Sequence, residues 1–518
     1  MRLLFVWLAL VIGGSGAARA EWLEASSAHF VVCADDSEKD IRTISDQIER
    51  YHAALEMVTG QKPATPSPSG RVTVYVVGSA AKVRSLYGSG GSNIGGFYIP
   101  RAGGSVAIIP RVDAAANRGL AGWSMLTLLH EYAHHFTIAT STFPVPRWMG
   151  EGGAEFFASA SFDGKGGVML GRPADHRAGE LVYARDVPAS DLLDPDRYEK
   201  RASASFDAFY GKSWLLYHYL VFEPSRKGQF VAYIKGLFAG KTSRAAAEAA
   251  FGDLGKLERD IESYMRKPRL NVLSIKGSDL AVGPVSVRRL GPGEAAMMPL
   301  RVRSRRGVDS EQATQLVAEA RAIAQRYPGE AAVWTELAEA EHDAGNDDAA
   351  IAAADRALTI DPRQPDAYVQ KGLALFRKAR DSDDDARTAA YARARAPFVA
   401  LNKLENDHPL PLIYYYRSFI DQGKRPPPLA VQGLARAAEL APFDLGLRMT
   451  LAMQQLRDGS PGDARRSLEP VAYNPHGGNL AEAARKVLTR LDREPAWNGA
   501  GADAAALGAN DDTDGSGD

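Results

Sequence analysis

The chain has 518 residues, of which 45% are hydrophobic and 24% charged, with 49 glycines and 29 prolines. This ordinary globular composition excludes a collagen, a fully disordered chain and a polytopic membrane protein, and the length suggests about three domains. The formal net charge of −1 removes the electrostatic case for nucleic acid or an anionic membrane as the main partner. The single cysteine, Cys33, lies in an apolar run that predicts a buried strand thiol.

The first twenty residues have the pattern of a secretory signal peptide. Arg2 precedes an apolar stretch, Leu3–Ile12, and the small-x-small sequence Ala18–Ala20 forms a cleavage site. The apolar stretch is shorter than the ~20 residues of a bilayer span. We therefore expect an exported chain, in the bacterial periplasm or secreted, with no stable membrane insertion after cleavage. Retention of the segment as an anchor is the alternative.

Predicted strands and helices alternate after the signal peptide and indicate an α+β domain. Apolar residues at spacings of three and four predict a helix over Glu38–Val58. Strands are predicted at His29–Ala34, Arg71–Val77, Phe97–Pro100 and Ser105–Pro110, and further helices at Trp123–Thr140, Trp148–Ala160, Ser205–Phe222, Gly228–Ala239 and Arg244–Lys267.

A short segment with β-like runs follows this domain. The runs are Asn271–Ile275, Val285–Arg289 and Met298–Val302, with glycine and proline between them. The segment ends in the basic cluster Arg301–Arg306. We expect this cluster to be a solvated interdomain linker, with a binding patch as the alternative.

The C-terminal part of the chain is a helical repeat. Pro328 and Pro362 are 34 residues apart, as are Trp334 and Tyr368, and an acidic insertion lengthens the interval before Pro409. The period and its signature positions resemble the tetratricopeptide repeat, with about four copies. Because each helix pair buries its apolar face only against its neighbours, we expect an all-α solenoid whose concave surface binds a protein partner.

These patterns divide the chain into five parts. The last of them is rich in glycine, alanine and aspartate without periodicity, which is typical of a disordered tail. The predicted parts are a signal peptide (1–20), an enzyme-like α+β domain (21–270), a β-rich connector (271–308), a tetratricopeptide-repeat domain (309–492) and the tail (493–518).

The strongest chemical signal is the sequence His-Glu-Tyr-Ala-His. On a helix, His130 and His134 lie one turn apart on the same face, and Glu131 leaves the helix in an adjacent direction. Catalytic zinc commonly takes three protein ligands and a water, and Glu151 on the following helix is the natural third ligand. Glu155, one turn further, is placed to accept a hydrogen bond from the outer nitrogen of a ligating histidine. The alternative is a helix whose polar residues face solvent.

These residues carry a family resemblance. His-Glu-x-x-His followed by Trp-x-x-Glu-Gly-x-Ala resembles the gluzincin zinc peptidases, the superfamily of thermolysin and the aminopeptidase-N-like enzymes. Residues 22–268 as a whole resemble the peptidase-MA-like domain of exported bacterial proteins that carry tetratricopeptide repeats. The resemblance implies a zincin-like α+β fold and these roles: zinc ligands His130, His134 and Glu151, general base Glu131, and ligand-orienting carboxylate Glu155.

A second segment, Phe209–Leu220, resembles the aminopeptidase segment whose tyrosine donates to the tetrahedral oxyanion. The aligned residue is Tyr210, although Ser213 replaces the glycine that is usual there. A core aromatic at the start of a helix is the alternative role for Tyr210. His218 is the alternative donor, but its neighbours predict a packed helix face.

One motif of the aminopeptidases is absent from this chain. Their Gly-x-Met-Glu-Asn sequence grips a free amino terminus, whereas the comparable stretch here, residues 95–109, contains no carboxylate. If Ser105–Ile109 is the edge strand beside the metal, it can pair with an extended peptide. We therefore expect an endopeptidase rather than an aminopeptidase.

Three functions are consistent with the sequence. The first is an exported zinc metallopeptidase that acts on a peptide or protein substrate, with repeats that dock a partner or present the substrate. The second is a protein-interaction scaffold whose peptidase-like domain is catalytically silent. The third is a metal-dependent hydrolase of a non-peptide amide in the cell wall or on a lipid. The complete metal-ligand set favours an enzyme over the silent scaffold.

Overall fold

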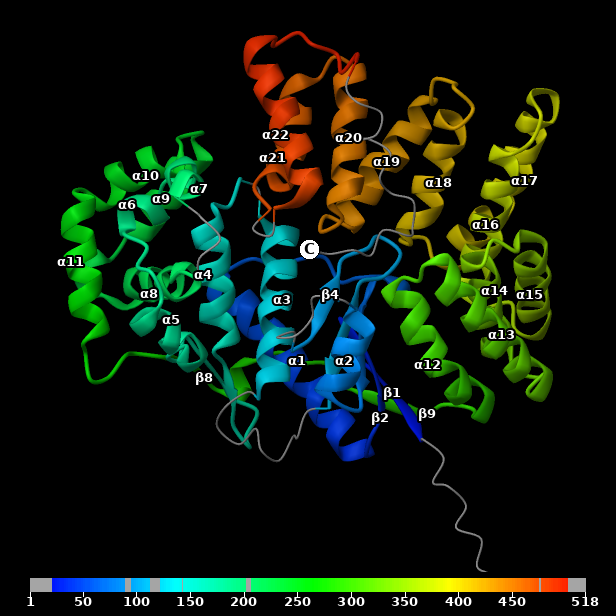
Figure 1. Ribbon diagram of the computed structural model, residues 1–518, viewed down its shortest axis with the longest axis horizontal. Coiled ribbons are helices and arrows are strands. Elements are labelled where there is room, and N and C mark those ends of the chain that lie inside the picture. Colours follow the sequence, from blue (N-terminus) through cyan, green and yellow to red (C-terminus); the bar gives the residue numbers. More distant parts are fainter. Residues whose placement is uncertain are drawn as a thin grey trace, which may run out of the picture.

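The computed structural model describes residues 21–88, 95–111, 122–141, 143–201, 206–474 and 477–501. An α+β region and an all-helical region lie against each other (Figure 1). The predicted signal peptide and residues 502–518 of the predicted tail lie outside the described residues. In the described ranges no helix has the length and apolar character needed to cross a bilayer.

A six-stranded mixed sheet forms the centre of the α+β region, in the order β4-β5-β3-β2-β1-β9. The three middle strands β5, β3 and β2 are parallel, while β4 is antiparallel to β5. Among the described strands β4 and β9 form the two edges, and the expectation that Ser105–Ile109 forms an edge is wrong because β5 lies between β4 and β3. The strands are β1 (Trp22–Ser26), β2 (Phe30–Asp35), β3 (Val72–Val77), β4 (Phe97–Ile99), β5 (Val106–Pro110) and β9 (Ser286–Arg289).

Helices cover both faces of this sheet. One face packs against α1 (Glu38–Thr59) and α3 (Trp123–Thr140), and the other against α2 (Ala80–Tyr87) and α12 (Pro292–Arg306). Alternation along each strand supplies both faces, since successive side chains point in opposite directions. Cys33 belongs to the second face and is buried, as its apolar neighbours predict.

A helical subregion follows α3 and shares its hydrophobic core. It carries a second sheet in the order β6-β7-β8. Its elements are α4 (Arg147–Ala158), β6 (Ser161–Phe162), β7 (Val168–Leu170), α5 (Ala178–Tyr183), α6 (Ala189–Leu192), α7 (Pro195–Arg201), α8 (Phe209–Phe222), α9 (Gln229–Phe238), α10 (Ser243–Phe251), α11 (Leu254–Met265) and β8 (Leu273–Ile275).

The segment between the two regions is part of the fold. Strand β8 pairs with β7 and β9 with β1, so both of its first two β-like runs join sheets of the α+β region. The third run, Met298–Val302, lies inside helix α12. Its apolar residues fit a helix face or a strand equally well, because a short run does not separate the two periods.

The C-terminal region is a solenoid of helix pairs, which begins with α12 and α13 and ends with the single helix α22 (Figure 1). The acidic insertion lies between α16 and α17, where α17 has 21 residues. Beyond α22, Trp497 of the predicted tail packs on the final helices. The helices are α13 (Ser310–Arg326), α14 (Ala331–Asp343), α15 (Asp347–Ile360), α16 (Pro365–Arg380), α17 (Asp384–Leu404), α18 (Pro409–Ile420), α19 (Pro428–Leu440), α20 (Leu445–Arg457), α21 (Pro461–Ala472) and α22 (Gly478–Arg493).

Candidate metal centre

Two consecutive helices carry the residues that the sequence singled out. Helix α3 places His130 and His134 on one face, while its apolar residues at helical spacing pack into the main core. Its C-terminus is followed by a turn that leads to Pro146, after which α4 begins and carries Glu151 and Glu155 one turn apart. All four side chains are buried, and both carboxylates have no exposed surface.

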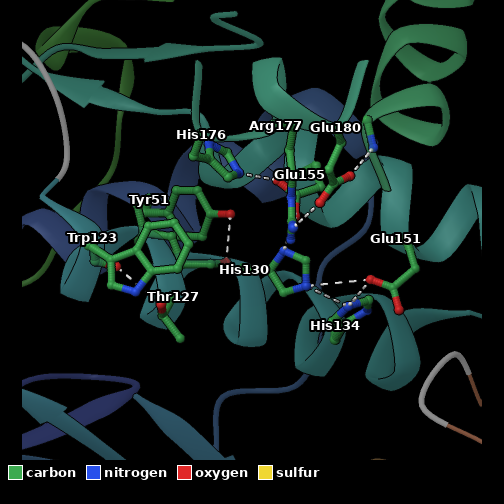
Figure 2. Close-up of polar contacts among 12 residues, drawn as sticks. Tyr51, Trp123, Thr127, His130, His134, Glu151, Glu155, His176, Arg177 and Glu180 are labelled. Carbon is green, nitrogen blue, oxygen red and sulfur yellow. Dashed lines mark hydrogen bonds and ion pairs between the residues drawn. The ribbon is translucent and has the colours of Figure 1, made fainter. Parts of the chain in front are cut away.

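The three predicted ligands converge on one point (Figure 2). The Nε2 atom of His134 lies 3.1 Å from Nε2 of His130 and 3.2 Å from Oε2 of Glu151. The distance between His130 Nε2 and Glu151 Oε2 is 3.5 Å. One ligand atom from each residue falls within 4.8 Å of the others, a spacing that could hold a single metal ion.

Glu155 lies behind His130, on the side away from the triad. Its Oε1 atom is 3.3 Å from Nδ1 of His130. A proton on Nδ1 can therefore be donated to Glu155, which leaves the lone pair of Nε2 directed at the triad. This is the orientation that the sequence spacing predicts for Glu155.

Two further side chains hold Glu155 in place. Its Oε2 atom is 2.5 Å from Nε2 of His176, and its Oε1 accepts hydrogen bonds from Nε and Nη2 of Arg177 at 2.9 and 2.6 Å. Arg177 also pairs with Glu180, which accepts a hydrogen bond from the backbone N–H of Gly211 at the start of α8. Figure 2 shows this chain of contacts running from His130 to α5.

The buried charges perturb one another strongly. Burial lowers the pKa of His130, but hydrogen bonds to Glu151 and Glu155 outweigh it and raise that pKa to about 10. Burial alone would raise the pKa of Glu151, whereas the charge of His134 and hydrogen bonds from both histidines hold it well below its usual range. These pKa values indicate an ionised carboxylate at Glu151 beside a protonated imidazolium at His130.

Glu131 lies on the neighbouring side of α3 and is half-buried. Its charge acts on His130 and on Tyr98 of the edge strand β4. The hydroxyl of Tyr98 is 2.5 Å from Nδ1 of His135. The predicted base is thus close enough to the triad and to the edge strand β4 for its charge to act on both.

Tyr210 lies at the start of α8, near enough to the predicted ligand Glu151 for their charges to interact. Burial and the charge of Glu151 raise its pKa to about 12, although a hydrogen bond from Arg147 opposes this shift. The guanidinium of Arg177 lies 4.7 Å from the Tyr210 ring centre, and that of Arg147 lies 4.6 Å from the Phe209 ring. Since arginine only donates, the hydroxyl proton of Tyr210 remains available to a substrate.

His218 is not at the metal centre. It is fully buried, its Nε2 donates to the carbonyls of Gly171 and Asn271, and its Nδ1 accepts from Tyr264. Burial lowers its pKa to about 4. Because every ring nitrogen is engaged in the core, His218 is excluded as the alternative donor.

The glycines of α4 allow a close contact between two helices. A Cβ on Gly152 would lie 2.4 Å from the carbonyl oxygen of Ser213, and one on Gly153 would lie 3.2 Å from the Tyr217 ring. They therefore bring α4 close to α8 rather than to α3. The same approach places Tyr210 next to Glu151.

Sequence reasoning did not find His176, Arg177 or Arg147. The first two come from a 3-10 turn, Asp175–Arg177, more than twenty residues after Glu155. Only the scarcity of histidine, ten in the chain, could have drawn attention to His176. Arg147 lies one helical turn before Glu151, a spacing that could have placed it on the ligand face.

Comparisons with known proteins give two family matches. A family described as "Protein of unknown function (DUF1570)" matches residues 124–241, the segment that contains the triad and Tyr210. The tetratricopeptide repeat matches residues 331–376, so the helical region contains this repeat. No curated protein matches the chain. Among solved structures, a thermophilic tetratricopeptide-repeat protein of Thermus thermophilus is 15% identical, with 35% of this chain and 92% of that chain covered and a TM-score of 0.30.

Proposed function

We propose that this chain is an exported zinc metallopeptidase of the gluzincin type, with a zincin-like α+β domain and Glu131 as general base. The observation that supports it most is the buried convergence of His130, His134 and Glu151, with ligand atoms within 4.8 Å of one another. Two imidazoles and one carboxylate form a donor set that catalytic zinc sites use. The contact from Glu155 to His130 adds the outer hydrogen bond that such histidine ligands usually make.

The residues fit a divalent cation. Glu151 is fully buried, and its Oε1 atom has no hydrogen-bond partner among the described residues. A buried ionised carboxylate is costly unless it is paired or bound to a metal. The donor atoms are nitrogen and oxygen, which suits zinc better than magnesium or calcium.

Each catalytic side chain has a definite task in this proposal. A bound zinc ion would lower the pKa of its water to about 7 and polarise the substrate carbonyl. Glu131 accepts the proton of the attacking water and passes it to the leaving amine. Tyr210 donates its hydroxyl proton to the oxygen on which negative charge develops. Arg177 packs against the ring of Tyr210, and Arg147 donates a hydrogen bond to its oxygen, so the two arginines hold the side chain in place.

The edge strand supports a peptide as substrate. β4 has a neighbour on one side only among the described strands, and an extended chain can add to such an edge through main-chain hydrogen bonds. Residues 95–100 contain no carboxylate that would bind a free amino terminus. We therefore propose endopeptidase activity, and the repeats are proposed to bind a protein partner or the substrate.

The test is the zinc content of the chain without residues 1–20, measured by atomic spectroscopy beside Glu151→Ala. We expect about one zinc per chain, lost in the variant. The matched control is Glu49→Ala, another buried helix glutamate that pairs with a histidine, His29, away from the triad. The control should keep its zinc. Absence of zinc from the unmodified chain after addition and dialysis would refute the enzyme and leave the repeats as an interaction scaffold.

A further inference from the structure

A small pocket lies where the C-terminal end of α3 meets the solenoid. The zinc-ligand candidate His134 forms part of its wall, and two residues of the last helix pair form another part. In Figure 1, α21 lies beyond the end of α3. The pocket is lined by His134, Thr137, Ile138, Ser141, Phe143, Val145, Gly150, Pro470 and Tyr473.

The contacts next to this pocket fix the solenoid against α3. The ring of His135 packs against that of Phe443 in a tilted arrangement, with centres 4.4 Å apart, and Arg448 donates to the carbonyl of Ile138 at 3.5 Å. Ile138 also belongs to an apolar cluster formed mainly by α18, α19 and α20. Helix α21 follows α20 directly, so these contacts determine where Pro470 and Tyr473 lie.

Two polar contacts anchor the solenoid to the turns that precede β3 and β5. The backbone N–H of Ala102 donates to Asp444 at 2.9 Å. The backbone N–H and the hydroxyl of Ser69 both donate to the Glu405 carboxylate, at 2.9 and 2.8 Å. The solenoid therefore contacts the α+β region at several separate places, which is the behaviour of a docked unit rather than of a free arm.

Charged groups in the connector strengthen the docking. Arg301 and Arg305 of α12 are half-buried and pair with Glu336 and Glu339 of α14 and with Asp366 of α16. The same helix packs its apolar residues on the sheet. The basic cluster is thus neither a solvated linker nor a free binding patch, and the acids of α14 and α16 are already neutralised within the chain.

We propose that α21 completes the substrate cleft, with Pro470 and Tyr473 forming the wall that lies across the pocket from His134. The occupant is a small aliphatic side chain of the peptide residue next to the bond that is cleaved. This inference rests on the proposed peptidase function. His134 connects the two, because it belongs both to the triad and to the wall of the pocket.

The chemistry of the pocket selects that occupant. Ile138, Phe143 and Val145 line it together with the two solenoid residues, and among the described residues no acidic or basic side chain other than His134 contributes. Its volume of about 30 Å³ restricts the occupant to a small group. Tyr473 contributes the largest side chain of the wall, with 46% of its surface exposed. Its removal should open the pocket to larger groups.

The first test measures how far the wall shields the pocket from solvent, and it requires neither bound metal nor enzymatic activity. Thr137→Cys places a thiol in the pocket. Cys33 should not react with the reagents, because it is buried and burial raises the pKa of its thiol to about 12. The metal-free full chain is treated with a small and a bulky thiol reagent. We expect slow labelling by the bulky reagent, and severalfold faster labelling when Tyr473→Ala is added.

The control is Leu429→Ala, which removes an exposed apolar side chain of the solenoid on α19 that does not line the pocket. It should leave the labelling rate of Thr137→Cys unchanged. Equal rates with and without Tyr473→Ala would overturn the wall assignment, because the pocket would then be open to solvent. A chain that retains threonine at 137 gives the background rate of Cys33.

The second test measures substrate preference in the zinc-loaded chain with peptides that differ in one aliphatic or aromatic residue. Tyr473→Ala should reduce the preference for small over large side chains by about tenfold or more in kcat/KM, while Leu429→Ala leaves it unchanged. If the chain takes up zinc but Tyr473→Ala changes neither the labelling rate nor the substrate preference, only the assignment of Tyr473 to the wall is refuted. Failure to take up zinc would refute the peptidase, and with it the peptide occupant.

Discussion

Two clusters of charged side chains differ in the type of cationic side chain that faces their carboxylates. At the candidate metal centre, Glu151 and Glu155 face two histidines, and an imidazole can lose a proton and bind a metal instead. Between α12 and the solenoid, carboxylates face arginines, which stay protonated at any physiological pH. The first cluster can therefore exchange its cation, whereas the second is a permanent structural contact.

The comparison predicts that function and stability separate. Glu131→Gln should slow cleavage of an unfolded protein substrate by about 10²–10⁴, because the variant cannot accept the proton of the attacking water. Zinc content and melting temperature should not change, since Glu131 is only half-buried and is not in the triad. Cleavage at the original rate would show that another group is the base.

The second cluster should behave in the opposite way. Arg305→Met leaves the buried Glu339 without its partner and Asp366 with Arg301 alone, and should lower the free energy of unfolding by about 3–5 kcal/mol. Arg303→Met is the matched control on the same helix, because its pair with Glu319 is partly exposed and should contribute at most about 1 kcal/mol. Denaturant titrations measure both. Equal losses for the two variants would contradict the comparison.

The acids of the second cluster should also make stability depend on pH. Burial raises the pKa of Glu336 to about 7, more than the charge of Arg301 lowers it, whereas an unfolded glutamate titrates near 4.5. Between these values only the folded chain keeps the proton, so the free energy of unfolding falls as pH rises, and it levels off above 7.

Glu336→Gln removes this proton and should flatten the profile by about 2–3 kcal/mol between pH 4.5 and 7. Urea titrations at a series of pH values measure the difference from the unmodified chain. Glu319→Gln, on the exposed side of α13, should keep the original slope. The prediction fails if Glu336→Gln has the same slope as the unmodified chain.

The smallest expected effect concerns Glu155. Glu155→Gln keeps the shape of the side chain but weakens its hydrogen bond with Nδ1 of His130, and should reduce zinc affinity by about 10–100-fold. Competition with a zinc chelator measures this change. The Glu151 ligand remains, so stoichiometry at saturating zinc should still be about one. Unchanged affinity would mean that His176 and Arg177 hold Glu155 for a structural reason only.

The sequence predicted local features of the site better than contacts between distant segments. His130, His134 and Glu151 were found because helical spacing and one short turn relate them directly. His176 and Arg177 were missed because the fold, not a period, brings their turn to Glu155. Strand order failed for a similar reason, since alternation shows that a strand exists but not which neighbour it has.

The connector shows that the partners of charged residues are equally hard to predict from sequence. A basic run such as Arg301–Arg306 is usually solvated, and its partner acids are spread over two helices of the solenoid that no local pattern links to it. The repeats themselves were predictable because the 34-residue period is visible in the sequence. Their docking on the α+β region was not, because it depends on surfaces that form only after folding.

The pairing of β9 with β1 has a practical consequence for dissecting the chain. A fragment ending at residue 270 would lack β9 and would leave β1 as an open edge, able to pair with another molecule. It would also lack α12 and expose the sheet face that contains Tyr75 and Ile108. Such a fragment should aggregate, whereas one ending after Gly307 retains the cover of both edge and face.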